Sequence, residues 1–291
     1  GNWNPFVGYS DNTFTVPALP QPDAPYTITD DATGGDCHWI GTWDSGTKTC
    51  SVISGGIQSG QADVTATTSD GIIIGSDGIT IQGELFLDEY VSNIVGPTAG
   101  DFAGIKIDGK SNITIKNFNF VDFGYGILAE NVDTLTIENV VNSGGQRAVD
   151  FQIDNSNNVV LDGMIPNTSS ELFITNSNNV VVKNNGPSNS WGAIKIGNSH
   201  YVEITDSYVT GPPNYGRGTI QIAAQSSNIN IHDNDVSAIT TSGGQFGIYY
   251  AEDGGCSSSD IPNYCYSVGT VGTGIVIKDN TIYGSISMTS I

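Results

Sequence analysis

Residues 226–234 have the sequence SSNINIHDN, and the same pattern occurs as SNITIKN at 111–117 and as SNNVVVKN at 177–184. In each stretch, Ser and Asn precede two apolar residues that are separated by one further residue, and a polar turn-forming residue follows. Alternation of apolar residues with other residues predicts a short strand with one buried face. Recurrence of the whole pattern predicts that this strand belongs to an internal repeat.

The repeat contains three strand-like cores in each unit. The central units are 21 to 24 residues long, and later units lengthen to 27 and 46 residues. The main cores are Ile79/Ile81, Ile113/Ile115, Leu135/Ile137, Val159/Leu161, Val180/Val182, Val202/Ile204, Ile229/Ile231 and Ile275/Ile277. The cores that precede them are Ile105/Ile107, Ile127/Ala129, Phe151/Ile153, Leu172/Ile174, Ile194/Ile196, Ile220/Ile222 and Ile248/Tyr250, and a weaker third core follows. Three short strands in so few residues favour a solenoid, in which each coil buries its inward side chains against its neighbours.

A column of turn-forming residues follows the main core of each unit. It consists of Asn117, Asn139, Gly163, Asn184, Asp206, Asp233 and Asp279. A tight bend between strands needs a residue that tolerates left-handed backbone dihedrals, so we interpret this column as structural. Stacked Asn amides can also hydrogen-bond from coil to coil. Over roughly residues 70–291 the chain resembles the right-handed parallel β-helix family, including pectate-lyase-like and NosD-like repeats. The resemblance implies the fold and says almost nothing about activity.

We therefore predict an all-β protein, a right-handed single-stranded parallel β-helix with three short strands per coil. Residues 1–69 are predicted to form an extended arm and a disulfide hairpin that caps the solenoid, and residues 70–291 form the β-helix. The segment CHWIGTWDSGTKTC (37–50) predicts a hairpin closed by Cys37 and Cys50, with Trp39 and Trp43 packed on the first coil. The leader around it resembles one found before β-helix repeats in secreted microbial and archaeal surface proteins. A second disulfide, Cys256–Cys265, is predicted to pin an insertion at 247–274.

Charge and composition limit the classes of partner that the chain can bind and the compartments in which it can reside. With 9 Lys and Arg against 30 Asp and Glu, the net charge of −21 argues against nucleic acid and against polyanionic sugars. Local disulfides predict an oxidising compartment, and the start at GNWNPF, without Met or a signal-like segment, predicts a mature chain from which any secretion signal has already been removed. No apolar run reaches the roughly 20 residues of a membrane span. Asn112 and Asn167 lie in glycosylation sequons.

No cofactor is required by any motif of the chain. Calcium is the one ion that the composition favours, because acidic turns such as TDDATGGD (29–36) carry oxygen ligands. No spacing typical of a known calcium loop is present, so the calcium hypothesis names no specific site. The histidines, His38, His200 and His232, have no ligand spacing, and we expect surface or turn roles for them.

One outward stripe carries the residues that we considered for catalysis. Alternation predicts that it points into solvent, and its members are Lys106, Leu128, Gln152, Phe173, Lys195, Gln221 and Tyr249. Asp150 and Glu171 lie beside it on consecutive coils, so their carboxylates are expected about 5 Å apart, as a retaining glycosidase requires. Trp191, Lys195, Arg217 and Tyr249 are the candidate binding residues around this pair. In a chain so rich in acids such a pair also arises by chance, and the sequence does not favour an enzyme. Lys195 and Arg217 do not share a register position, so the pattern of the lyases that use Lys and Arg is not matched.

The ends of the solenoid lead to the hypothesis that we favour. The final segment TIYGSISMTSI contains Ile286, Met288 and Ile291, and no helix, Pro or Lys covers this edge. Either the natural chain continues beyond Ile291 or something covers the edge, and a neighbouring molecule is one candidate. The segment NTFTVPAL (12–19), with Phe14 and Val16, is extended and suits strand donation to another subunit. These features predict a secreted structural or adhesive protein that associates end to end, as a filament or surface layer. The alternatives are a carbohydrate-active enzyme, either a glycoside hydrolase or a lyase, and a glycan-binding module.

Overall fold

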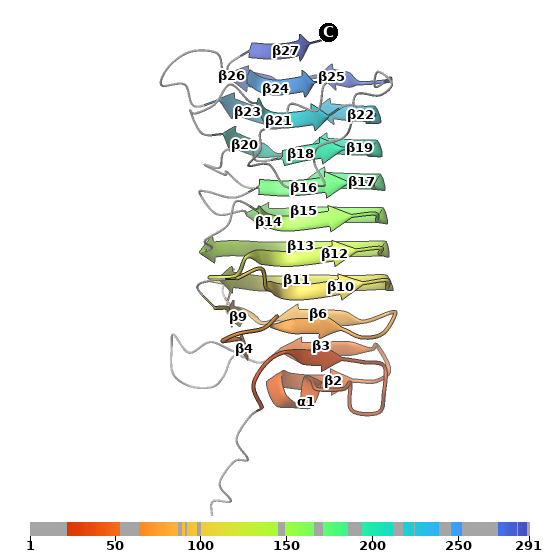
Figure 1. Ribbon diagram of the computed structural model, residues 1–291, viewed down its shortest axis with the longest axis vertical. Coiled ribbons are helices and arrows are strands. Elements are labelled where there is room, and N and C mark those ends of the chain that lie inside the picture. The colour runs from red at the N-terminus through yellow and green to blue at the C-terminus, as the bar shows by residue number, and fades with distance from the viewer. Residues whose placement is uncertain are drawn as a thin grey trace, which may run out of the picture.

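The protein is a solenoid whose coils stack along its long axis (Figure 1). The computed structural model describes residues 22–52, 64–86, 89–90, 92–97, 100–144, 149–165, 171–185, 194–211, 218–223, 225–238, 246–251, 273–283 and 285–289. Almost all of its regular structure is β, and the pairing between coils is parallel throughout. The predicted all-β parallel β-helix is therefore confirmed.

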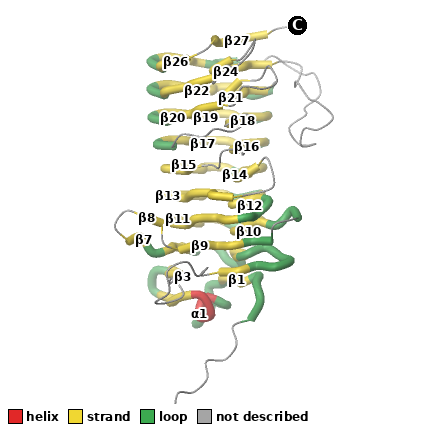
Figure 2. Tube along the Cα trace, turned by 90° about the vertical axis from the view of Figure 1, so that its left-hand side faces the viewer, coloured by secondary structure: helices red, strands yellow, loops and turns green. Residues whose placement is uncertain are grey.

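The first sheet receives one strand from each coil. Its strands, in spatial order, are β1 (Tyr26–Ile28), β5 (Ile72–Ile74), β10 (Ala103–Asp108), β12 (Tyr125–Glu130), β14 (Val149–Asp154), β16 (Glu171–Thr175), β18 (Ile194–Gly197), β21 (Gly218–Ala223), β24 (Phe246–Ala251) and β27 (Ser285–Thr289). Spatial order follows chain order, because each coil lies directly on the preceding one (Figure 2).

The second sheet forms another wall of the solenoid. Its strands are β2 (Gly41–Asp44), β3 (Thr49–Val52), β6 (Thr80–Gly83), β11 (Ser111–Val121), β13 (Asp133–Gly144), β15 (Asn157–Ile165), β17 (Asn178–Lys183), β19 (His200–Thr205), β22 (Ser227–His232) and β25 (Val276–Lys278), with β4 (Val64–Thr65) and β9 (Ser92–Val95) paired beside them. In β11, β13 and β15 the main core and the weaker third core run on as one long strand. In the later coils the third core forms a separate third sheet of β20 (Tyr208–Gly211), β23 (Asp235–Ala238) and β26 (Thr281–Tyr283). A small antiparallel hairpin, β7 (Leu85–Phe86) and β8 (Glu89–Tyr90), lies outside these walls.

The N-terminal end is sealed by a short helix and a disulfide hairpin. Helix α1 (Cys37–Ile40) buries Cys37 and Ile40, and β2 pairs with β3 in antiparallel fashion. Cys37 and Cys50 form the predicted disulfide, and Trp39 and Trp43 pack against the core as expected. Strand pairing crosses the predicted boundary near residue 70, because β1 and β3 already pair in parallel with β5 and β6. The predicted arm at 1–21 lies outside the described residues.

The core is a set of aligned apolar columns. On the first sheet Ile105, Ile127, Phe151 and Leu172 occupy equivalent register positions, and each is at most 3% exposed. Full burial of one such side chain contributes about 1.5–3 kcal/mol. Because every coil adds equivalent residues to each column, the apolar interior is continuous from coil to coil.

The predicted column of turn residues has the predicted backbone conformation. All seven members have positive φ, with Asn184 at 53° and Asp233 at 56° as examples. The amide stacking is found mainly at another corner, where Asn155 donates to Asn131 Oδ1 at 2.6 Å and Asn198 donates to Asn176 Oδ1 at 2.9 Å. Both corners therefore use Asn, one chiefly for its backbone freedom and the other also for its side-chain amide.

A buried row of serines links successive coils, and we call Ser156, Ser177, Ser199 and Ser226 the serine ladder. The backbone N–H of each serine donates to the hydroxyl of the next, from Ser156 to Ser177 at 3.1 Å and from Ser177 to Ser199 at 3.1 Å. The hydroxyl of Ser177 in turn donates to the carbonyl of Thr175 in its own coil at 2.7 Å. The hydroxyls of Ser156, Ser177 and Ser199 each satisfy two backbone groups that would otherwise be buried without partners.

Candidate functional site

The predicted acidic pair lies at the start of two neighbouring strands. Asp150 belongs to β14 and Glu171 begins β16, and these strands pair in parallel. The register pairs Val149 with Glu171 and then Phe151 with Leu172, so Asp150 occupies a local irregularity of the ladder. The two backbones are adjacent, as the repeat predicts. Their side chains lie outside the described part of the structure, so the pair remains a prediction.

The outward stripe has the predicted order but not the predicted exposure. Lys106 pairs with Leu128, Leu128 with Gln152, Gln152 with Phe173, Phe173 with Lys195 and Lys195 with Gln221. Four of these side chains are buried, contrary to the prediction that they point into solvent: Gln152 at 7%, Phe173 at 3%, Lys195 at 4% and Gln221 at 3% exposure. Alternation fixes only the side of the sheet on which a residue lies, and it carries no information about what else packs there.

Lys195 is the chemically distinctive residue of this stripe. Its ammonium lies 4.7 Å from the centroid of the Phe173 ring, which belongs to the preceding coil. A cation held over an aromatic face recovers part of the free energy lost when it leaves water. Phe173 itself packs with Ala223 in a small apolar cluster outside the main core. The arrangement can hold a positive charge beside the start of β16, where Glu171 lies.

The other predicted binding and assembly residues are described only in part. Tyr249 lies in β24 and pairs with Gln221, and its side chain is outside the described residues. Asn112 is exposed at a corner with φ of 55°. Ile286 and Met288 belong to β27. The remaining predicted residues lie outside the described ranges: Phe14, Val16, Asn167, Trp191, Arg217, Cys256, Cys265 and Ile291.

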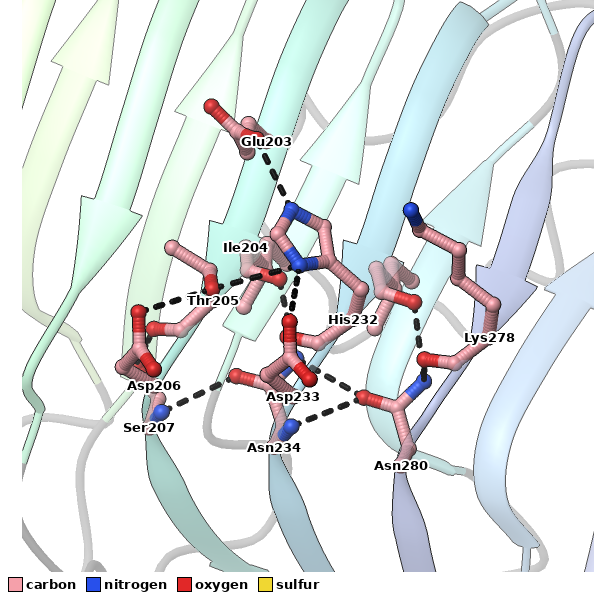
Figure 3. A network of polar contacts seen from close by, with 11 residues as sticks. Glu203, Ile204, Thr205, Asp206, Ser207, His232, Asp233, Asn234, Lys278 and Asn280 are labelled. Atoms are coloured by element: carbon pink, nitrogen blue, oxygen red, sulfur yellow. Dashed lines mark hydrogen bonds and ion pairs between the residues drawn. The ribbon is translucent and has the colours of Figure 1, made fainter.

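A second cluster, which sequence reasoning missed, surrounds His232 at the corner between the second and third sheets (Figure 3). Its Nε2 lies 2.8 Å from Glu203 Oε1 of the preceding coil, and its Nδ1 lies 2.7 Å from Asp233 Oδ2. Nδ1 is also 3.4 Å from the hydroxyl of Thr205, which donates to Asp206 Oδ2 at 2.9 Å. The register pairs Thr205 with His232, so the repeat brings them together, whereas the diagonal contact with Glu203 depends on side-chain geometry.

The two carboxylates set the charge of His232. Its side chain is only 16% exposed, and the hydrogen bonds with Asp233 and Glu203 raise the pKa of the imidazole above its usual value. Both ring nitrogens face carboxylate oxygens, and both can donate only when the ring is protonated. In its protonated form His232 is an ion-pair partner that links two coils, and both of its ring nitrogens are occupied by carboxylates.

The acidic turn at 29–36, the example given for the calcium hypothesis, uses the Asp31 carboxylate for local structure. Asp31 accepts hydrogen bonds from the backbone N–H of Gly35 at 3.0 Å and of Thr33 at 2.8 Å, and from the hydroxyls of Thr29 and Thr33. These donors hold the pKa of Asp31 well below its usual range. Across the described ranges, no three His, Cys, Asp or Glu side chains are grouped so that they could hold a metal ion. In the same ranges, no helix combines the length and the apolar character that crossing a membrane requires.

Comparison with known proteins identifies the fold family. Residues 103–288 match the family described as the right handed beta helix region, which also confirms the predicted hand. The similar solved structures include two A-modules of mannuronan C-5 epimerases from Azotobacter vinelandii. AlgE4 has 10% sequence identity and a TM-score of 0.37, and the match covers 91% of this chain and 98% of that one. AlgE6 has 10% identity and a TM-score of 0.34, with coverage of 92% and 100%. At these values neither likeness informs on activity, and no curated protein matches the sequence.

Proposed function

Since this chain belongs to the family of right-handed β-helix proteins, we propose that it is an extracellular structural protein that associates with a second copy of itself through its C-terminal coil. The observation that carries the proposal is the exposure of Ile286. Ile220, Ile248 and Ile286 occupy one inward column of the first sheet. Ile220 and Ile248 are 0% and 1% exposed, whereas Ile286 is 47% exposed.

Association would complete this column and the strand ladder beside it. Covering the exposed half of one Ile side chain contributes about 1 kcal/mol. The partly buried Ile275, Ile277 and Ile282 of the same region would gain further contacts. Strand β27 ends the first sheet and pairs with β24 on one side only within the described residues, so its other edge offers backbone groups to a second strand.

Of the two described ends of the solenoid, only the C-terminal one exposes apolar core residues, and this favours a closed pair over a filament. The described N-terminal end has its apolar interior covered by α1, where Cys37 is 0% and Ile40 is 4% exposed. A C-terminal coil that met a C-terminal coil would form a two-fold interface, which closes after two copies. In a filament, the C-terminal end of one copy would instead have to fit the N-terminal end of the next copy. Two β27 edges related by such a two-fold axis would pair in antiparallel fashion.

The disulfide and the charge support the extracellular compartment of the proposal. The Cys37–Cys50 bond supports an oxidising, extracellular setting, because such bonds are rare in reducing compartments. The net charge of −21 keeps an extracellular protein soluble and disfavours contacts between copies except where apolar surface is matched.

Sedimentation velocity of the 291-residue chain over about a hundredfold range of concentration tests the proposal. We expect a concentration-dependent dimer. Ile286→Asp should weaken dimerisation at least about tenfold, since a two-fold interface loses the apolar contact twice and gains two charges. Tyr201→Asp is the matched control, because it introduces the same charge at a residue that is 59% exposed on another part of the surface. A wild-type monomer at every concentration, or equal effects of both variants, would disprove the proposal.

A second candidate, carbohydrate chemistry at Asp150 and Glu171, is supported by the ladder irregularity at Asp150. Such irregularities often redirect a side chain next to an active site. A reducing-sugar screen on neutral polysaccharides would reveal turnover, and Asp150→Asn and Glu171→Gln should each abolish it. Turnover that survives both substitutions would remove this pair from consideration.

A further inference from the structure

Two exposed tyrosines lie on the outer face of the third sheet. Tyr208 begins β20 and Tyr283 ends β26, with β23 between these strands (Figure 1). Val209 and Val236 face the core at 3% and 0% exposure, so the residues that alternate with them face outward. Tyr208 is 42% exposed and Tyr283 is 59% exposed. They are two of the five large hydrophobic side chains that are exposed among the described residues.

The strand register fixes the separation of the two tyrosines. Tyr208 aligns with Asp235 and Thr281, while Ser237 aligns with Tyr283. The tyrosines are therefore two strands apart across the sheet and two residues apart along it. With about 4.8 Å between strands and about 3.3 Å per residue, their Cα atoms lie about 12 Å apart on a diagonal. One extended ligand could contact both rings.

Polar groups occupy the face between the rings. Asp235, Ser237 and Thr281 face outward with the tyrosines, and Thr281 is exposed. The Asp235 backbone is fixed by a hydrogen bond from its N–H to the carbonyl of Ser207 at 2.9 Å. Its Oδ1 is shielded from solvent and has no hydrogen-bond donor among the described residues. A buried carboxylate oxygen without a donor is costly, and a ligand hydroxyl at this face would supply the missing donor.

We propose that this outer face, from Tyr208 across Asp235 to Tyr283, binds a neutral glycan. Sugar rings have flat C–H faces that pack on aromatic rings, and their hydroxyls donate to carboxylate and hydroxyl oxygens. Tyrosine suits this task because it presents a rigid apolar face together with a polar tip. The ligand is neutral because the chain carries a net charge of −21 and Asp235 would repel an anionic sugar.

This inference is independent of the self-association proposed above, because it concerns the wall of the solenoid and not its end. It is also separate from the predicted stripe on the first sheet, whose described central side chains are buried. A protein partner is the competing occupant, and the experiment below separates it from a glycan.

The test measures binding of the 291-residue chain to cellohexaose, xylohexaose, mannohexaose and chitohexaose by titration calorimetry, with polygalacturonate as an anionic contrast. We expect one of the neutral oligosaccharides to bind and the anionic polymer not to bind. Tyr208→Ala and Tyr283→Ala should each weaken binding about tenfold. Asp235→Asn should weaken it severalfold, because the amide is a poorer acceptor of a hydroxyl hydrogen bond. Tyr201→Ala is the matched control, since Tyr201 is as exposed as Tyr283 but lies in β19 of the second sheet, and it should leave binding unchanged.

The outcomes are distinct. Absence of binding to all four oligosaccharides, or an equal loss in Tyr201→Ala, would overturn the proposal. If Tyr208→Ala and Tyr283→Ala instead reduce the dimer in sedimentation and no oligosaccharide binds, the face is a protein interface and the glycan proposal is wrong. Circular dichroism of each variant establishes that the fold is retained, which is expected because both tyrosines are exposed.

Discussion

Replacement of His232 by Gln should remove a pH-dependent part of the stability of the last coils. In the folded protein the imidazolium lies between Glu203 and Asp233, which raise its pKa. The folded-state pKa lies above the unfolded value of about 6.5, so the stabilisation is fully present below that pH. It is lost as the pH rises through the folded pKa, because the ring then gives up the proton that one of the two hydrogen bonds needs.

The size of the effect follows from the exposure of the partners. Glu203 and Asp233 are 42% and 55% exposed, so each pair is partly screened by water and contributes at the level of a surface ion pair. Two such pairs, with one imidazolium shared between them, contribute about 1 kcal/mol. Asp206 adds negative charge nearby, and Lys278, which aligns with His232 in the next coil, offsets part of the attraction.

The assay is urea denaturation of the wild type and of His232→Gln at a series of values from about pH 5 to about pH 9. The wild type should be about 1 kcal/mol more stable than the variant at the acidic end, and the difference should fall toward zero at the basic end. His200→Gln is the control, since the His200 ring bonds to the hydroxyl of Ser227 and to no carboxylate within the described residues. A constant difference between wild type and His232→Gln across the whole range would refute the reasoning.

Two further predictions concern the contacts between coils. Ser177→Ala should cost about 2 kcal/mol in urea denaturation, because the Ser177 side chain is the buried acceptor of the Ser156 N–H and a donor to Thr175. Ser111→Ala is its control and should change stability by less than about 0.5 kcal/mol, and equal effects would contradict a role for the ladder. Asn184→Ala should cost about 1 kcal/mol because φ at this position is 53°, whereas Asn184→Gly should be better tolerated. If thermal denaturation ranks Ala above Gly, the interpretation of that column is wrong.

The sequence was sufficient to predict the architecture because the fold repeats one local rule. Residues such as Ile127 and Asn184 occur at the same place in each unit, so register and turn conformation follow from spacing alone. Two members of the serine ladder, Ser156 and Ser177, precede an Asn in the repeated pattern, whereas Ser199 precedes His200 and Ser226 precedes Ser227. The role of the ladder was not predicted, because the geometry of the corner decides whether the Ser177 side chain faces the interior, and the sequence pattern does not define that geometry.

Features that depend on contact between different surfaces could not be predicted in this way. Burial of Lys195 and Gln221 on the outside of the first sheet requires knowledge of what packs over that sheet. The contact between His232 and Glu203 joins residues that differ by 29 in sequence and runs diagonally between coils, so it depends on side-chain torsions. Alternation and spacing describe the backbone, and these contacts are decided by side-chain conformation.

The serine ladder gives the solenoid a direction of growth. In each step a coil donates its N–H to the coil that follows it in the chain, as Ser156 does to Ser177 and Ser199 does to Ser226. A growing chain therefore leaves an unpaired Ser N–H at the corner of its newest coil, beside the unpaired edges of its strands, and the next coil supplies the acceptor. Because each coil packs on the one before it, we expect folding to proceed coil by coil from the disulfide-bonded N-terminal end.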